Sequence, residues 1–92
     1  MDTRQFFLDG SGIFNSPDFH DAVAAVLSFP AYYGRNLVAL YDCLSEIQED
    51  THLVIRNWHH IEFHLKDYSG KAVYVFHVAC QENPHLHVSL EP

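Results

Sequence analysis

Apolar and polar residues follow one another along the chain in a pattern that predicts three short strands separated by helices. Arg4–Asp9 is rich in Phe and Leu and ends at an Asp-Gly turn, His52–Arg56 is apolar at its centre, and Leu86–Leu90 alternates apolar with polar residues. These features are typical of strands. Because helical segments separate them, we expect the three strands to pair in parallel.

Helical patterns occupy most of the remaining chain. Ser16 and Pro17 open a helix that continues through Ser28, and Asn57 is a candidate cap for a short helix that ends at Lys66. We expect Asp67–Gly70 to form a loop. The pattern of Lys71–Glu82 is ambiguous, because its valines and tyrosine favour a strand whereas the spacing of its apolar residues favours one face of a helix.

The most informative stretch is Phe29–Leu44, which reads FPAYYGRNLVALYDCL. It begins as a loop, in which Pro30 fixes φ and Gly34 is free to adopt a positive φ. Asn36 is a good N-cap for a helix that we expect to continue to about Glu49. Apolar residues at three- and four-residue steps predict the core face of this helix, namely Leu37, Leu40, Tyr41, Leu44 and Ile47.

Asp42 lies in the middle of this helix, where Asp is a mediocre helix former and is too far from Asn36 to cap the N-terminus. One interpretation is an ordinary solvated carboxylate, since most charged side chains are exposed. The other is an anion held rigidly beside an aromatic loop and presented to a cationic pocket on a partner. The pattern alone leaves both interpretations open.

The same stretch resembles the barstar family of intracellular ribonuclease inhibitors. The resemblance is dense over this loop and helix, looser at Leu53–Ile55 and Val75–Phe76, and the whole chain has the family's length. The matching residues are Pro30, Tyr32, Tyr33, Gly34, Asn36, Leu37, Ala39, Leu40, Asp42, Cys43 and Leu44.

The resemblance implies an α/β fold in which a small three-stranded parallel sheet is packed by about four helices. The length of 92 residues predicts one domain, over residues 1–92, and the resemblance makes it barstar-like. The resemblance also favours a helix at Lys71–Glu82. It also implies that the loop and helix form the inhibitory surface. There Asp42 would enter the ribonuclease active site, where the substrate phosphate would lie, and Tyr32 would pack against the enzyme. The further expected partner contacts are Tyr33, Gly34, Asn36, Val38, Tyr41, Ser45, Glu46 and Val78.

Several residues differ from those of the best-known member of the family. Val38 and Val78 stand where that inhibitor has acidic residues, Tyr41 replaces a tryptophan, and Arg35 replaces an acid. We expect these differences to leave the fold unchanged and to select a different target enzyme, with Val38 and Val78 as apolar contacts.

Composition and charge restrict the class of partner. The chain has 92 residues, of which 48% are hydrophobic, and a formal net charge of −7 with only 5 Lys and Arg residues. That charge argues against direct nucleic-acid binding and against anionic membrane surfaces, and it favours a basic ribonuclease as partner. No secretory leader or membrane-spanning run is visible, so we expect a cytoplasmic protein. We expect it to be a monomer when free.

The eight histidines raise the alternative of a metal site. His60 and His64 are four residues apart, and His85 and His87 are two apart, which places each pair on one face of a helix or strand. A zinc site needs three or four converging ligands. Since no HExxH or CxxC motif is present, we interpret these histidines as surface residues and expect neither a metal nor a cofactor.

A Cys–His hydrolase is the enzyme alternative, with Cys43 or Cys80 as nucleophile and His77 as base. No oxyanion-hole motif accompanies them, so we expect no enzyme activity and two reduced cysteines. We therefore interpret the chain as an acidic, intracellular ribonuclease inhibitor of the antitoxin or immunity type. The alternative is a binding module of the same fold whose protein target is not a nuclease.

Overall fold

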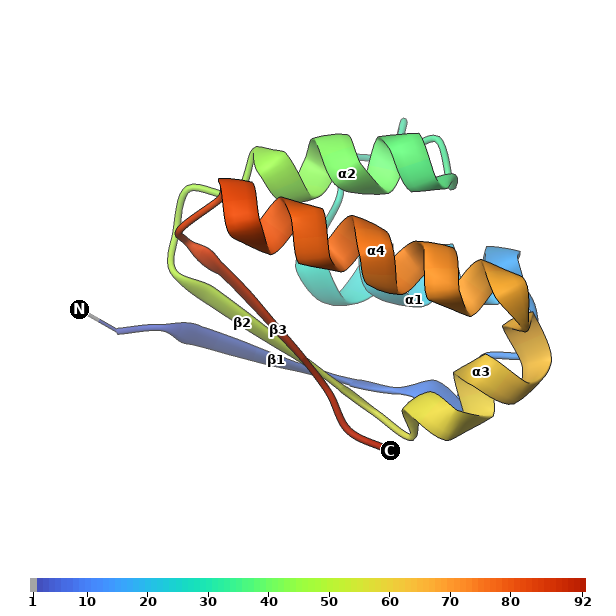
Figure 1. The fold of residues 1–92 in the computed structure, drawn as a ribbon. Helices are drawn as coiled ribbons and strands as arrows, with labels where there is room; N and C mark the ends of the chain where they lie inside the picture. Colours follow the sequence, from blue (N-terminus) through green and yellow to red (C-terminus); the bar gives the residue numbers. More distant parts are fainter. Residues whose placement is uncertain (1) are drawn as a thin grey trace.

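Three strands pair in parallel in the order β1-β2-β3 in the computed structural model, which describes residues 2–92 (Figure 1). The register aligns Leu8 with Ile55 and Ile55 with Leu90. Leu8, Leu53 and Ile55 are buried in the core. The elements are β1 (Arg4–Asp9), a 3₁₀ turn η1 (Gly10–Gly12), α1 (Ser16–Leu27), α2 (Leu37–Ser45), β2 (Thr51–Arg56), α3 (Trp58–Leu65), α4 (Asp67–Glu82) and β3 (Leu86–Leu90).

The helices α1, α2 and α4 lie on one side of the sheet, and α3 lies near the carboxyl ends of β1 and β2 (Figure 1). The helix α1 packs against β1, α4 packs against β3, and α2 packs against α4. Leu40 and Leu44 lie on one face of α2, and both side chains are completely buried. The opposite face of α2 is left at the surface, farthest from the sheet. The predicted fold, a three-stranded parallel sheet packed by four helices, is confirmed.

The predicted bounds of two helices are wrong. A contact from a distant residue ends one helix early, and an unusual backbone conformation determines where the other begins. The helix α2 ends at Ser45 rather than near Glu49. Its end is held by Asn83, whose Nδ2 donates to the carbonyls of Leu44 at 2.9 Å and Ile47 at 3.0 Å. A partner some 40 residues away cannot be recognised from the local pattern.

The segment Asp67–Gly70, expected as a loop, is the first turn of α4. The break between α3 and α4 occurs instead at Lys66, which has φ 54° and ψ −125°. Asp67 follows directly and places a negative charge in the first turn of α4, where the helix dipole favours it. Lys71–Glu82 is helical, as the family resemblance implied. Among residues 2–92, no helix is both long and apolar enough to cross a membrane.

Candidate functional site

The loop between α1 and α2 turns Tyr32 outward and Tyr33 inward. Ser28 ends α1 in the left-handed conformation, and the N–H of Phe29 donates to the carbonyl of Ala24 at 2.9 Å. The N–H of Tyr33 then donates to the carbonyl of Pro30 at 2.9 Å and closes a turn. Tyr32 is 86% exposed at this turn, so its ring is free to contact a partner.

Tyr33 belongs to the core rather than to the exposed surface. Its side chain is only 9% exposed, and its ring centroid lies 5.0 Å from that of Phe29. We expected Tyr33 to act as a second aromatic anchor for a partner. Its burial gives it a packing role within the molecule, because the buried ring holds the loop against the rest of the molecule. A contact of Tyr33 with a partner stays a prediction.

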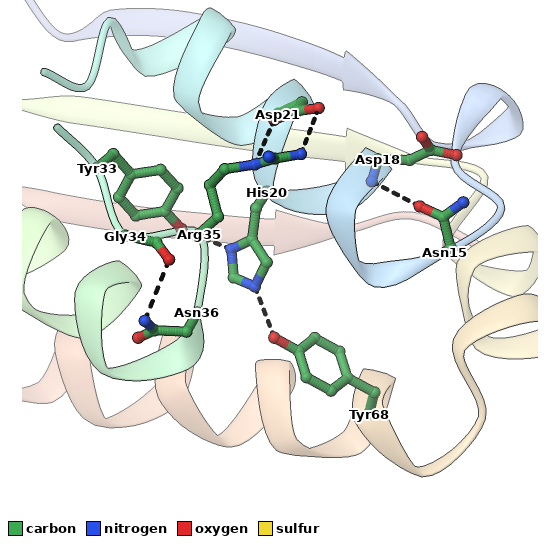
Figure 2. A network of polar contacts seen from close by, with 9 residues as sticks. All are labelled: Asn15, Asp18, His20, Asp21, Tyr33, Gly34, Arg35, Asn36 and Tyr68. Carbon is green, nitrogen blue, oxygen red and sulfur yellow. Dashed lines mark hydrogen bonds and ion pairs between the residues drawn. The ribbon is translucent and has the colours of Figure 1, made fainter. Parts of the chain in front are cut away.

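A buried histidine connects this loop to two helices (Figure 2). His20 of α1 is 1% exposed; its Nδ1 lies 2.6 Å from the hydroxyl of Tyr33, and its Nε2 lies 2.6 Å from the hydroxyl of Tyr68 in α4. A neutral imidazole donates from one nitrogen and accepts at the other, so one tyrosine donates to His20 and the other accepts from it.

The electrostatics of this connection keep all three groups uncharged. Burial lowers the pKa of His20, and the nearby Arg35 guanidinium acts in the same direction. Burial also raises the pKa of Tyr33 and of Tyr68. The three side chains therefore form a neutral link between α1, the loop and α4.

An ion pair at the surface fixes the other end of the loop (Figure 2). Arg35 places Nε 2.8 Å from Oδ1 of Asp21 and donates from Nη2 to Oδ2 at 2.9 Å. Arg35 also adopts a positive φ of 54°. Gly34 does not use its freedom to adopt a positive φ, since no glycine in residues 2–92 has one. A Cβ at Gly34 would lie 3.2 Å from Nδ2 of Asn36, so close packing is what favours glycine there.

Asn36 is the N-cap of α2, as predicted. Its Oδ1 accepts from the N–H of Ala39 at 2.8 Å, and its Nδ2 donates to the carbonyl of Gly34 at 3.2 Å (Figure 2). One side chain therefore satisfies an unpaired N–H of the helix and holds the preceding loop. This arrangement gives the side chains of α2 a defined orientation relative to Tyr32.

Asp42 is exposed on α2, and Glu46 follows it one helical turn later. Both carboxylates border a hollow of about 250 Å³ between the loop and α2. The residues that line this hollow are Pro30, Tyr32, Tyr33, Gly34, Ala39, Asp42, Cys43 and Glu46. The structure thus brings an exposed aromatic side chain and two acidic side chains to one concave surface.

A second hollow lies on the side of α2 that faces α4. It is a groove of about 320 Å³ between α2 and α4, and it joins Val38 and Tyr41 to Val78, three residues that we expected at the partner surface. Tyr41 donates a hydrogen bond to the carboxylate of Glu82, which raises the pKa of Tyr41. The hydroxyl of Ser45 donates to the carbonyl of Tyr41 at 2.8 Å, so Ser45 supports the helix backbone.

The sequence reasoning missed three residues of this groove, Leu37, Tyr74 and Val75. Leu37 was assigned to the core, although its side chain is only half-buried. Tyr74 and Val78 are four residues apart in α4, so they share a face of that helix. That signal was present in the sequence, but it could be read only once Lys71–Glu82 was known to be helical.

The histidines of the metal alternative lie outside both hollows, whereas Cys43 of the hydrolase alternative lines the hollow beside Asp42. The rings of His60 and His64 are 4.3 Å apart, yet no group of three or more His, Cys, Asp or Glu in residues 2–92 could hold a metal ion. Cys43 and Cys80 are both free thiols. Burial raises the pKa of each, which opposes the formation of a reactive thiolate.

Comparison with known proteins shows where the chain belongs. The family model described as Barstar (barnase inhibitor) matches residues 3–91. The protein named "Putative ribonuclease inhibitor YrdF" from Bacillus subtilis (strain 168) is 35% identical over 80 residues, which cover 86% of this chain and 88% of that protein. These matches confirm the family that the stretch Phe29–Leu44 predicted. The chain belongs to the barstar family of ribonuclease inhibitors.

Proposed function

We propose that the chain inhibits a ribonuclease by covering its active site with the loop before α2 and the exposed face of α2. The observation that carries this proposal is the placement of Asp42. It is an exposed carboxylate on a helix whose N-terminus is capped by Asn36 and whose preceding loop is tied to α1. A carboxylate held in this way can occupy the place of a substrate phosphate in a cationic active site.

Tyr32 and the acidic charge of the chain add to this surface. Tyr32 supplies a large, exposed aromatic ring with few rotatable bonds, which contributes contact area at a low cost in entropy. Glu46, together with the formal net charge of −7, creates a negative field around Asp42. That field accelerates the encounter with a basic enzyme.

Inhibition of this kind suits an antidote to a toxic or secreted ribonuclease. In this proposal the inhibitor is a cytoplasmic monomer that protects the cell that makes the nuclease. The printed name of the Bacillus subtilis relative, a ribonuclease inhibitor, supports the choice of a nuclease as target over another kind of protein. The chain itself does not bind RNA, since a chain with 5 basic and 12 acidic residues lacks a basic footprint.

The test is an RNA hydrolysis assay with barnase and other purified basic ribonucleases, in which the inhibitor and the substrate concentrations are both varied. We expect inhibition of at least one enzyme, competitive with RNA. Asp42→Ala should weaken it by about tenfold or more, because an enzyme cation is then buried without its partner. Its melting temperature should stay close to that of the parent protein, since Asp42 is exposed.

Glu62→Ala is the matched control, because it removes one exposed carboxylate from α3, which α4 separates from α2 in Figure 1. We expect this variant to inhibit as well as the parent protein. Inhibition that does not compete with RNA, or equal inhibition by Asp42→Ala and Glu62→Ala, would contradict an active-site block by Asp42. Co-expression with the inhibited ribonuclease then tests the protective role, because only a functional antidote restores growth of the host.

A further inference from the structure

The groove between α2 and α4 is an apolar surface that the proposed action of Asp42 does not explain. It measures about 320 Å³, and no charged side chain of residues 2–92 lines it. Val38 is 74% exposed and Tyr74 is 67% exposed, one on each wall of the groove. The lining residues are Leu37, Val38, Tyr41, Tyr74, Val75 and Val78.

The groove is continuous with the surface that carries Asp42. Val38 and Asp42 are four residues apart in α2, so their side chains lie one helical turn apart on the same face. Asp42 borders the hollow on the loop side, whereas Val38 lines the groove on the side of α4. A partner broad enough to cover Asp42 and Tyr32 therefore also covers Val38.

The charges around the groove select the chemistry of its occupant. Asp42 of α2 and Glu46 just after it are acidic, and Glu82 accepts a hydrogen bond from the hydroxyl of Tyr41. Lys71 is the basic residue of α4, one helical turn before Tyr74 and Val75. A second copy of this chain would bring acidic residues against acidic residues, on molecules whose formal net charge is −7. A basic partner with an apolar protrusion matches both the groove and its surroundings.

We infer that this groove receives a bulky apolar side chain of the target ribonuclease, next to the cation that Asp42 contacts. This inference rests on the proposed function and adds the feature that decides which ribonuclease is bound. An enzyme with a polar or charged side chain at that place would bury it against valine and tyrosine without a hydrogen-bonding partner. The groove thereby rejects ribonucleases that Asp42 alone would accept.

The experiment uses a displayed library of barnase in which the surface residues around the active-site cleft are randomised and the catalytic residues are kept. The library is selected for binding to the parent chain. Binders should gain bulky apolar residues relative to the unselected library. Their affinity should fall by about tenfold or more for Val78→Glu and for Val38→Asp. Val73→Glu is the matched control, because Val73 lies on α4 but outside the groove.

Two groove variants are used so that a loss of binding is not mistaken for a loss of folding. Val78 is half-buried, so Val78→Glu is used only if its melting temperature stays close to that of Val73→Glu. Val38 is exposed in the first turn of α2, where a new Asp is favoured by the helix dipole. Val38→Asp therefore removes apolar surface from the groove without a cost in stability. The affinity of the binders for Val38→Asp tests the groove even if Val78→Glu unfolds.

The outcomes separate this inference from the proposed function. Binders without apolar enrichment, or binders that tolerate both groove variants, would overturn the groove assignment. A dimer of the free chain that Val38→Asp dissociates would assign the groove to a second copy and would also overturn it. Groove-dependent binders that still hydrolyse RNA at full rate would support the groove and contradict the active-site block.

Discussion

Arg35 and Asp21 hold the loop before α2 against α1 through two contacts of 2.8 and 2.9 Å, while the backbone of Arg35 has a φ of 54°. Both side chains are more than half exposed, so the pair itself contributes little to stability. The pair instead holds Arg35 in a left-handed backbone conformation, which residues with a Cβ disfavour.

The first prediction compares two substitutions of Arg35. Arg35→Ala and Arg35→Gly both remove the ion pair, but only alanine keeps the strain of about 1–2 kcal/mol at a positive φ. Glycine loses more chain entropy on folding, which offsets part of this difference. The free energy of unfolding in urea should be about 0.5–1 kcal/mol higher for Arg35→Gly than for Arg35→Ala. Equal values, or the opposite order, would show that the left-handed conformation is not retained.

The second prediction separates the two adjacent tyrosines. Tyr33→Phe leaves one nitrogen of His20 without its partner in a buried site, so the free energy of unfolding should fall by about 1–3 kcal/mol. Tyr32→Phe should change it by less than about 0.5 kcal/mol, because Tyr32 is at the surface. Tyr32→Ala should instead weaken ribonuclease inhibition. Urea unfolding and inhibition assays on the same preparations check both expectations, and equal stability losses at the two positions would contradict them.

The third prediction concerns pH and follows from the low pKa of buried His20. In the unfolded chain the imidazole titrates near its ordinary value of 6.5, whereas in the folded protein it titrates lower. Below that value the unfolded state binds a proton that the folded state does not, so the free energy of unfolding should fall as the pH decreases. The slope from His20 is at most about 1.4 kcal/mol per pH unit. Above pH 6.5 this effect is absent.

Urea unfolding between pH 7.5 and 5.5 measures this slope. His20→Gln should reduce the slope by up to about 1.4 kcal/mol per pH unit, which corresponds to the uptake of one proton on unfolding. An NMR titration of the wild-type protein is the second measurement, because it follows the ring of His20 directly. A His20 ring that titrates at or above 6.5 would contradict the assignment of a neutral buried link.

The fourth prediction concerns the rate of association with an inhibited ribonuclease. In the proposed function the negative field around Asp42 accelerates encounter, and salt screens exposed charges over about 10 Å at 0.1 M ionic strength. The association rate should therefore fall as salt is raised from about 0.02 to 0.5 M. Glu46→Gln should reduce the rate at low salt and leave the dissociation rate nearly unchanged, as expected for a charge at the rim. Association that is independent of salt would rule out electrostatic steering.

Local signals were sufficient for the strands and for the start of α2. Arg4–Asp9 and Leu86–Leu90 form strands with the predicted bounds, because their apolar pattern directly reflects one buried face of a sheet. Asn36 caps α2 as its residue type suggests. The family resemblance supplied what the pattern could not, namely the helical state of Lys71–Glu82.

The remainder depends on contacts between distant segments. Tyr33 and Tyr32 are the same residue type in adjacent positions, and only the packing of Phe29 and the hydrogen bond to His20 distinguish the buried one from the exposed one. The groove likewise needs residues of both α2 and α4, which are joined only in the folded protein. The sequence and the family resemblance could name Val38, Tyr41 and Val78 as candidates, but they could not reveal that Tyr74 lies beside them.

The link through His20 has a consequence for the order in which the protein becomes active during its synthesis. Tyr32 and Asp42 lie in the first half of the chain, yet His20 requires Tyr68 for its second hydrogen bond, and α2 packs against α4. A nascent chain that ends before α4 contains every residue of the loop and of α2 but lacks the surface that holds them. The ribosome must therefore translate α4 before the surface around Asp42 is assembled, and we expect a chain that ends before α4 to inhibit no ribonuclease.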